Sequence, residues 1–432
     1  MKFYSLSTPQ HNVSFRKAVI EGLAPDRSLY FPEVIPRLDA SHTDKDSHRP
    51  FEELAFDALW PFVSPDLSAS ELSEVLQKTL HFELPLVAVG DYLALELYHG
   101  PTLAFKDIGA RFMAECLGLF NQKEQKSKKT VVLVATSGDT GGAVASGFLG
   151  VENVEVVILY PKGKISDVQE LQMTTFHQNI RAIAVDGTFD DCQRWVKQAF
   201  VDADLKQQID LTSANSINVA RWLPQMLYYL KAYHQLRESG ERRDLVVSVP
   251  SGNFGNLCAG LLTQQMGIPF KRFIAATNVN DTVVRYLEGS DYSPKETVPT
   301  LSNAMDVSDP SNFIRIETLL GSDTLRKQLK GYRFTDGETL EAIASIDKLH
   351  AYCAEPHGAI AYLGLERDQL HIDRELGIFL ETAHPIKFAA AVEKALNRPL
   401  EEPEIIKALR HKSPQNERLS TYEELKTVLL SY

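Results

Sequence analysis

The chain has 432 residues, which is enough for two or three domains with large buried cores. Hydrophobic residues make up 44% of the chain and charged residues 24%, as in an ordinary soluble protein. The net charge is -12 and no long basic run occurs, so we expect no nucleic-acid partner.

The four cysteines are widely scattered and form no CxxC pair, so they predict neither a disulfide framework nor a zinc site, and we expect no metal. They are better explained as small apolar residues in a reducing compartment. The N-terminus lacks the apolar core of a signal peptide. The longest uncharged run, residues 245–270, is broken by glycines and prolines and does not predict a membrane span. We therefore expect a cytoplasmic protein with no membrane partner.

Residues 1–85 are expected to form a separate N-terminal unit. The patterns predict, in order, a short helix over 13–20, a proline-bounded extended segment over 28–38, a polar loop or linker over 40–50, and helices near 51–62 and 68–80. No catalytic motif stands out in this part of the chain. A capping or docking domain is the favoured interpretation.

Lys106 lies between the turn at Gly100 and Pro101 and a helix predicted to begin directly after it. The positive end of the helix dipole and burial both disfavour an ammonium at this position. Both effects favour the neutral amine that a Schiff base requires. On this stretch alone, a surface lysine that opens an ordinary amphipathic helix remains the better interpretation.

From about residue 86 the pattern changes to alternating strands and helices. Residues 131–150 and 245–267 each predict a strand, a Gly-rich loop and a helix of small residues. Further strands are predicted over 154–163, which ends in a turn, over 180–186 and 272–278, and over 376–385, which ends in a polar tip. Such alternation favours an α/β fold with open parallel sheets that are covered by helices on both faces. Ligands of such folds bind at the carboxyl ends of the strands.

Two glycine-rich loops follow predicted strands and precede predicted helices. Pro250–Asn256 offers backbone N–H groups and a helix N-terminus to an anion but contains no Lys or Arg; a tight turn without a ligand is about equally favoured. Ala135–Gly142 is similar, although Asp139 within it requires a cationic neighbour or a capping role. A third strand end carries Thr382, for which a simple turn is the alternative. His384, two residues later, is expected to be structural rather than catalytic.

Two anion-binding loops and a lysine at a helix start suit pyridoxal phosphate, which needs a lysine for its aldehyde, a phosphate site and a partner for its ring nitrogen. The segments HGPTLAFKD, ATSGDTG, SANSIN, PSGNFGN, SNAMDVSDPSN, EPHGA and ETAHP occur in this order. Together with KFYSLS at the N-terminus they closely resemble the threonine synthases of the bacterial and fungal long-chain type, over nearly the whole chain.

The resemblance implies a role for each matching residue. Lys106 would form the Schiff base, Thr382 would face the pyridine nitrogen, and Asp139 would lie near the 3′-oxygen. The cofactor phosphate would be held by Gly252, Asn253, Phe254, Gly255 and Asn256. The substrate carboxylate would be held by Thr136, Ser137, Gly138 and Thr140, and the substrate phosphate by Asn215, Ser216 and Arg221. Glu355 and His357 resemble a loop near the cofactor ring, Lys162 and Lys164 are candidate lid cations, and His99 stays unassigned.

The resemblance also implies fold type II, as in the tryptophan synthase β chain. A large cofactor-binding domain would comprise residues 86–106 and 211–432, and a small mobile domain residues 107–210. The implied reaction is the lyase step that ends threonine biosynthesis: O-phospho-L-homoserine and water give L-threonine and phosphate, in a monomer or small homo-oligomer.

Three alternatives stay open at this point. The first is a sister enzyme, such as a threonine dehydratase or an O-acetylserine sulfhydrylase, against which the SANSIN segment argues. The second is a phospho-lyase that stops at a keto acid. The third is a binding or sensor protein without catalysis, against which the intact Lys106 argues.

Overall fold

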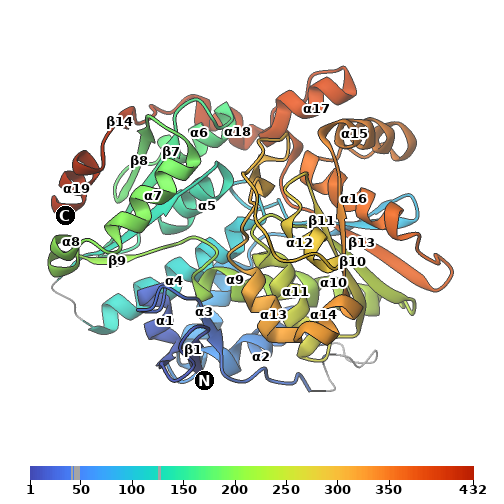
Figure 1. Cartoon of the computed structure of the whole chain (residues 1–432), viewed down its shortest axis with the longest axis horizontal. Helices are drawn as coiled ribbons and strands as arrows, with labels where there is room; N and C mark the ends of the chain where they lie inside the picture. The colour runs from blue at the N-terminus through green and yellow to red at the C-terminus, as the bar shows by residue number, and fades with distance from the viewer. Residues whose placement is uncertain (40–41, 43–48, 125–127) are drawn as a thin grey trace.

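The computed structural model describes residues 1–39, 42, 49–124 and 128–432, and three β-sheets organise this part of the chain (Figure 1). The linker expected over 40–50 lies mostly outside the described residues. Among the described residues, no helix is both long enough and apolar enough to span a bilayer.

The N-terminal unit is a small antiparallel sheet with three helices beside it. The strand order is β2-β1-β3, with β1 (Lys2–Ser5), β2 (Asn12–Ser14) and β3 (Tyr30–Pro32). The helices are α1 (Phe15–Glu21), α2 (Phe51–Val63) and α3 (Ala69–Thr79). The helix expected over 13–20 begins later than predicted, because residues 12–14 pair with β1 as a strand. The two helices expected near 51–62 and 68–80 are confirmed.

The largest sheet has six strands in the order β12-β11-β10-β13-β5-β4. They are β4 (Leu86–Val89), β5 (Tyr92–Glu96), β10 (Asp244–Pro250), β11 (Phe270–Thr277), β12 (Leu329–Arg333) and β13 (Glu375–Glu381). All neighbours pair in parallel except the edge strand β4, which is antiparallel to β5.

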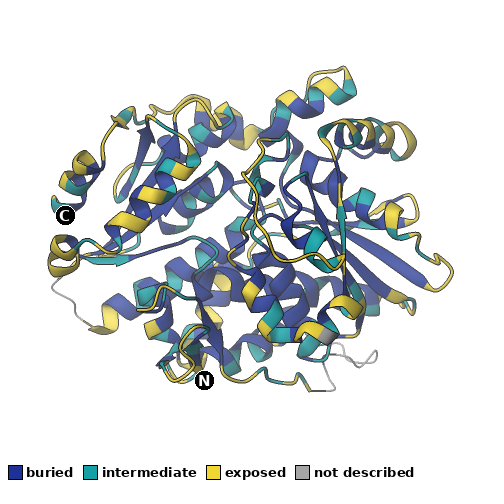
Figure 2. Ribbon diagram, viewed as in Figure 1, coloured by how far each residue is buried: buried dark blue, intermediate teal, exposed yellow. Residues whose placement is uncertain are grey.

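Alternate residues of this sheet pack on helices of opposite faces, as the two-residue period of a strand requires. Val247 belongs to the core that contains α10 (Met226–Glu238) and α11 (Gly255–Gln265). Its neighbour Val246 belongs to the core that contains α15 (Asp336–His350) and α16 (Pro356–Asp368). Figure 2 shows the central strands as mostly buried and the outer surface of α15 as exposed. The predicted parallel sheet with helices on both faces is therefore confirmed.

The second large sheet has five parallel strands in the order β14-β8-β7-β6-β9. They are β6 (Thr130–Ala135), β7 (Val154–Pro161), β8 (Ile180–Val185), β9 (Asp210–Thr212) and β14 (Glu417–Leu419). One face packs against α4 (Lys106–Glu124) and α5 (Asp139–Phe148). The other face packs against α7 (Phe189–Ala199) and α19 (Tyr422–Leu430).

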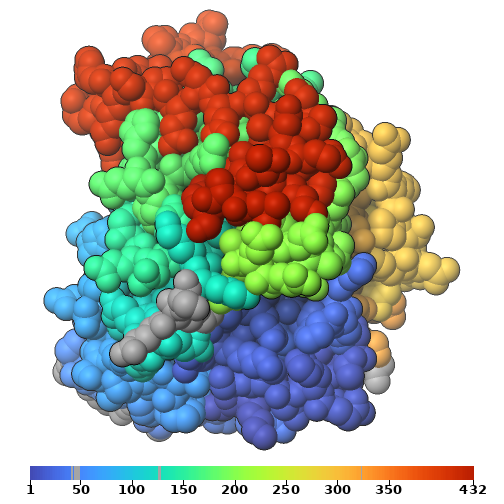
Figure 3. Space-filling model, turned by 90° about the vertical axis from the view of Figure 1, so that its left-hand side faces the viewer, coloured from blue at the N-terminus to red at the C-terminus, as the bar shows by residue number. Residues whose placement is uncertain are grey.

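The C-terminal end of the chain returns to this five-stranded sheet. Strand β14 pairs with β8, and Arg181 on β8 forms an ion pair with Glu417 at 2.6 Å. Figure 3 shows the C-terminal segment, in red, lying against the green surface of this unit. The predicted boundaries assign residues 211–432 to the large domain, whereas β14 and α19 lie against the five-stranded sheet. The division into domains stays a prediction.

Shorter elements connect the layers. They are α6 (Asp167–Thr174), α8 (Ala203–Gln208), α9 (Val219–Trp222), η2 (Leu223–Gln225), α12 (Thr282–Leu287), η3 (Asn303–Met305), α13 (Phe313–Leu320), α14 (Ser322–Gln328), η4 (Pro385–Phe388), α17 (Ala389–Leu396) and α18 (Glu404–Arg410). The carboxyl ends of β6, β10 and β13 each lead into one of the loops that the sequence singled out.

Candidate active site

Lys106 is the first residue of α4, and its side chain is 15% exposed. Its Nζ lies 3.3 Å from Oδ2 of Asp139 and 5.1 Å from the centre of the Phe105 ring. Burial lowers the pKa of Lys106 below its ordinary value, and the nearby Lys387 and Arg221 lower it further, although Asp139 raises it. The lysine is thus held in a place that favours its neutral, nucleophilic form.

Asp139 is the first residue of α5 and is buried between three donors. Besides Lys106, its carboxylate contacts Gln169 Nε2 at 3.0 Å and Lys387 Nζ at 3.1 Å. Burial raises the pKa of Asp139, but Lys387 and Lys106 lower it more, so the pKa lies well below its ordinary value. Asp139 therefore has the cationic neighbours that its position in an anion-binding loop requires.

The lysine loop and the end of β13 are joined by backbone hydrogen bonds. Phe105 N donates to Thr382 O at 2.8 Å, and His384 N donates to Leu103 O at 3.0 Å. Ala104 and Ala383 form an antiparallel bridge between these two bonds. Two positions that are far apart in the sequence, 106 and 382, are therefore held in one fixed arrangement.

The hydroxyl of Thr382 donates to Oε1 of Glu355 at 3.0 Å. Glu355 is fully buried, caps the N-terminus of α16, and also accepts from the backbone N–H groups of His357 and Gly358. The side chain of His357 contacts Glu355 through Nδ1, while its Nε2 is buried without a partner in the described structure. The EPHGA segment thus contacts Thr382 directly, through Glu355.

The loop 252–256 joins β10 to α11 and has the construction of an anion site. A Cβ atom on Gly252 would lie 2.6 Å from Met305 Cα, so the backbone there leaves no room for a side chain. Phe254 has a left-handed φ of 61° and packs its ring against Phe313. Asn256, in the first turn of α11, has a buried Nδ2 without a partner in the described structure. An N–H donor of this kind, at a helix N-terminus, fits a phosphate oxygen.

Thr136 shapes the loop between β6 and α5. Its Oγ1 accepts hydrogen bonds from Gly138 N at 3.0 Å and Gly141 N at 2.9 Å. Gly138 has a φ of 136°, and a Cβ there would lie 2.3 Å from the Gln169 side chain. Ser137 and Thr140 lie in the same turn, half-buried, beside Asp139. The loop therefore presents hydroxyl groups and backbone next to the lysine.

The NSINVAR segment brings its three candidate residues to different partners. Ser216 Oγ accepts from Asn253 Nδ2 at 2.6 Å, so it touches the glycine loop directly. Asn215 Nδ2 donates to Ala135 O at 3.0 Å, at the end of β6. Arg221 is buried and donates to Ala214 O, while its Nε has no partner in the described structure. These residues lie between the two glycine-rich loops.

Among the described residues Arg221 forms no ion pair. Burial lowers its pKa to about 10, although Tyr228 and Asp107 act in the opposite direction. An arginine buried in this way is suited to an anionic ligand, since a bound phosphate would supply the missing acceptors.

Three polar residues that bear on the site were missed by sequence reasoning. Lys387 follows the ETAHP segment on η4, and Gln169 and Gln172 lie on α6. The one sequence signal for Lys387 is its position, two residues after the ETAHP segment that was already singled out. The glutamines carry no motif, because their role depends on how α6 packs.

Other candidates lie elsewhere. His99 Nε2 contacts Glu96 Oε2 at 2.7 Å and is partly exposed. Lys162 and Lys164 are exposed beyond the end of β7.

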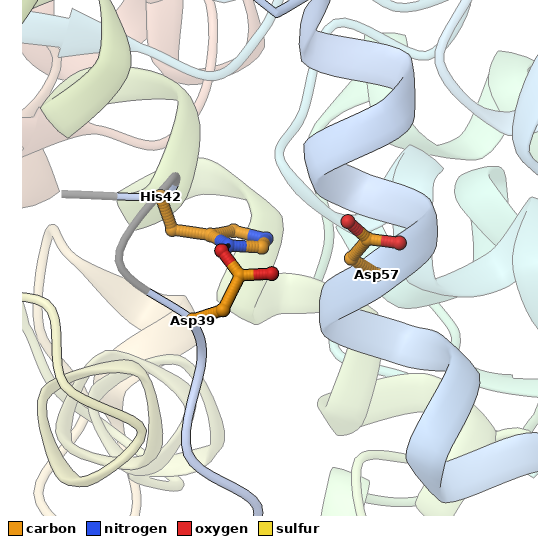
Figure 4. A group of neighbouring side chains, drawn as sticks. All are labelled: Asp39, His42 and Asp57. Carbon is orange, nitrogen blue, oxygen red and sulfur yellow. Dashed lines mark hydrogen bonds and ion pairs between the residues drawn. The ribbon is translucent and has the colours of Figure 1, made fainter. Parts of the chain in front are cut away.

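Asp39, His42 and Asp57 form a separate group in the N-terminal unit, with their ligand atoms within 4.8 Å of one another (Figure 4). Asp57 is already paired with Arg49 at 2.6 Å, and His42 Nδ1 lies 3.2 Å from Asp39. Ion pairs explain this group, and we assign no metal to it.

Family models match almost the whole chain. The model described as pyridoxal-phosphate dependent enzyme matches residues 82–380. The models described as threonine synthase N terminus and threonine synthase, C-terminal match residues 2–80 and 365–429. These matches leave few residues unassigned.

Relatives and solved structures agree with these models. The threonine synthase of Escherichia coli K12 is 47% identical over 404 residues, which cover 93% of each chain. The threonine synthase of Schizosaccharomyces pombe is 34% identical over 449 residues, which cover 89% of this chain and 87% of that one. A crystal structure of the Escherichia coli threonine synthase superposes with a TM-score of 0.92 at 44% identity over the whole of both chains. A pyridoxal-phosphate-bound threonine synthase from Brucella melitensis superposes with a TM-score of 0.91 at 30% identity, over 100% of this chain and 99% of that one.

The fold is that of a pyridoxal-phosphate-dependent enzyme of fold type II. The expectations of fold and cofactor are thereby confirmed. Within this class, the chain belongs to the threonine synthase family.

Proposed function

We propose that the chain converts O-phospho-L-homoserine and water to L-threonine and inorganic phosphate. The observation that carries this proposal is Arg221, a buried arginine that forms no ion pair in the described structure and is close enough to Lys106 to lower its pKa. A second anion site beside the cofactor lysine suits a phosphorylated substrate, which the dehydratase and sulfhydrylase alternatives do not use.

Pyridoxal phosphate supplies an aldehyde that condenses with amines and a ring that withdraws electrons from a deprotonated substrate carbon. Lys106 would hold its aldehyde. The loop 252–256 and Asn256 Nδ2 would hold its phosphate, and Thr382 would face its ring nitrogen. Asp139 would lie near its 3′-oxygen.

The remaining residues act on the substrate. Thr136, Ser137, Gly138 and Thr140 would bind the carboxylate through hydroxyl and backbone groups. Asn215, Ser216 and Arg221 would bind the phosphate, with Arg221 as the charged donor. Lys106, once free of the cofactor, would remove the Cα proton and then help to move the Cβ proton. Phosphate leaves from Cγ, which then gains a proton; water adds its hydroxyl at Cβ, and a proton is returned to Cα.

The proposal extends to the setting of the enzyme. The substrate is a small molecule, and we propose no nucleic-acid partner for this acidic chain. All four cysteines are free, and three are buried, which supports a reducing, cytoplasmic location.

The test is incubation of the cofactor-loaded protein with O-phospho-L-homoserine, with phosphate, threonine and 2-oxobutyrate assayed together. Equal amounts of phosphate and threonine are expected. Phosphate with 2-oxobutyrate would indicate a lyase that stops at the keto acid. Binding without any phosphate release would indicate a protein without catalysis and would refute the proposal.

A further inference from the structure

Lys387 is a fully buried lysine whose three contacts all lie in the active-site region. Its Nζ lies 3.1 Å from Asp139 Oδ1, 2.7 Å from Gln172 Oε1 and 2.8 Å from the backbone carbonyl of Thr102. An ammonium has three N–H donors, and three acceptors face this one. A buried lysine is costly unless it is paired and hydrogen-bonded, so these contacts fix its position.

The three acceptors of Lys387 lie on three segments that are distant from Lys387 in the sequence. Lys387 is on η4, directly after the last strand of the six-stranded sheet. Asp139 opens α5 beside the five-stranded sheet, and Gln172 is on α6. Thr102 lies in the loop that ends at Lys106. One side chain thus connects both sheet layers to the lysine loop.

Asp139 is placed between two lysines. Its Oδ1 faces Lys387 at 3.1 Å and its Oδ2 faces Lys106 at 3.3 Å. With Lys106 as the sole cation, the carboxylate would hold that lysine as an ammonium, which cannot attack an aldehyde. A second lysine supplies the balancing charge without taking part in the chemistry.

We propose that Lys387 is a positioning residue that provides the standing positive charge opposite Asp139, so that Lys106 is left free to act as an uncharged amine. This inference rests on the proposed function only through the assignment of Lys106 as the cofactor lysine.

The other charged groups around Lys106 do not replace Lys387. Asp107, on the same helix, directs its carboxylate to Thr102 N and Oγ1, at 2.9 Å and 2.6 Å. Arg221, on α9, also lowers the pKa of Lys106, but less than Lys387 does. His357, on α16, acts on Asp139 rather than on Lys106. Lys387 is the cation that contacts Asp139 opposite the reactive lysine.

The inference is tested by the rate at which the full-length protein, stripped of cofactor, takes up pyridoxal phosphate at different pH values. Uptake is followed by the visible absorption band of the bound cofactor, and only the uncharged Lys106 amine reacts. In Lys387→Gln we expect the midpoint of the rate profile to rise by about 1 to 3 pH units, because a neighbouring positive charge is lost. In Asp139→Asn the midpoint should fall, because a negative charge is lost.

Lys394→Gln is the matched control, since Lys394 is an exposed lysine seven residues further along the same segment. Its profile should superpose on that of the wild type. Opposite shifts in the two site variants would not arise from a general loss of packing. A Lys387→Gln profile that superposes on the wild-type profile would overturn the proposal.

Should Lys387→Gln fail to fold, the double variant Asp139→Asn/Lys387→Met removes the ion pair as a unit, which buried sites tolerate better than loss of one partner. Its midpoint should lie above that of Asp139→Asn alone, and equal midpoints would overturn the inference.

None of these measurements uses the substrate. A wild-type protein that takes up the cofactor but releases no phosphate from O-phospho-L-homoserine would refute the proposed function alone.

Discussion

The backbone N–H of Phe105 donates to the carbonyl of Thr382 at 2.8 Å, which ties the residue before the cofactor lysine to the residue proposed for the ring nitrogen. Lys106 and Thr382 are the two ends between which the cofactor ring would lie. Because the connection is made by backbone groups, it does not depend on either side chain. Substitutions at 106 and 382 should therefore change chemistry without moving the loop.

Lys106→Ala should remove the visible absorption band of the bound cofactor and lower turnover by about 10²- to 10⁴-fold or more, because both the nucleophile and the acid-base group are lost. The measurement is phosphate release from O-phospho-L-homoserine, together with the absorption spectrum. Lys123→Ala is the control on the same helix, since Lys123 is bonded to Glu71 at 2.8 Å near the far end of α4. Appreciable turnover in Lys106→Ala would contradict the assignment.

Thr382→Val should destabilise the protein, because the buried Glu355 carboxylate loses the hydroxyl that donates to it at 3.0 Å. Leaving a buried acceptor with one donor fewer costs about 1–3 kcal/mol in free energy of unfolding. Urea unfolding of the cofactor-free protein measures this change. Thr382→Ser keeps the hydroxyl and should lie close to the wild type. Equal stability of the Val and Ser variants would show that the hydrogen bond contributes nothing.

The sequence indicated the strands and the glycine-rich loops because each of these is marked by local pattern. Lys106 gained its proposed role only from the combination with these loops and from the family resemblance, since its own stretch favoured a surface lysine. Strand period, glycine spacing and a turn before a helix can all be read within about ten residues. The match of helix α2 with the predicted 51–62 pattern is an example.

Features that depend on contacts between distant segments could not be read in the same way. Lys387 contacts Gln172, which lies 215 positions earlier in the chain. The reason for a buried lysine at position 387 is therefore visible only once these segments are packed together. Strand β14 is three residues long and is defined by pairing with β8 rather than by its own sequence. The edge strand β4 likewise takes its antiparallel direction from β5.

Gly252→Ala should disturb the proposed phosphate loop, because the new Cβ would lie 2.6 Å from Met305 Cα and 2.8 Å from Ala304 O. Both neighbours are backbone atoms and cannot turn aside. Overpacking of this kind costs about 1–3 kcal/mol. We expect lower stability in urea and a higher dissociation constant for pyridoxal phosphate, measured by absorption titration.

Gly337→Ala is the matched control for that substitution. Gly337 lies in the first turn of α15, and the nearest atom to its new Cβ is 3.9 Å away. Alanine in a helix is favoured over glycine by about 0.5–1 kcal/mol, so this variant should be as stable as the wild type or slightly more. An equal loss of cofactor affinity in both variants would contradict a specific role for the loop at Gly252.

Glu381 gives the protein a pH-dependent stability. It is fully buried, its Oε1 accepts from Glu355 N, and its Oε2 has no partner in the described structure. Burial, followed by the charge of Glu355, raises the pKa of Glu381 well above its ordinary value of 4.5. The folded state then binds a proton that the unfolded state releases above that value, so stability falls as the pH rises from 4.5 towards the folded-state pKa.

Glu381→Gln should remove this dependence, because an amide keeps the shape of the protonated carboxyl and does not titrate. As the pH rises, the stability of the variant relative to the wild type should increase by about 1.4 kcal/mol for each pH unit between the unfolded-state and folded-state pKa values of Glu381. Urea unfolding at about pH 4 and at about pH 8 measures the gain. A stability difference that is the same at both pH values would show that Glu381 is ionised in the folded protein.

Arg221→Met should weaken binding of the phosphorylated substrate while leaving the cofactor in place. Hydrogen bonds to charged groups contribute about 1.5–3 kcal/mol, which corresponds to a loss of roughly 10- to 150-fold in kcat/KM. Because the phosphate is bound before and during the reaction, much of this loss should appear as a higher KM. Steady-state phosphate release measures both constants, and the absorption spectrum reports whether the cofactor is retained.

Arg194→Met is the arginine control, since Arg194 is largely exposed and paired with Asp191 at 2.6 Å on α7. Its kinetic constants should equal those of the wild type. Arg221→Lys keeps the charge but loses the planar pair of donors, so it should fall between the wild type and Arg221→Met. If Arg221→Met retained the wild-type kcat/KM, the substrate phosphate would have to bind elsewhere, and the preference for a phosphorylated substrate over those of the sister enzymes would lose its main structural support.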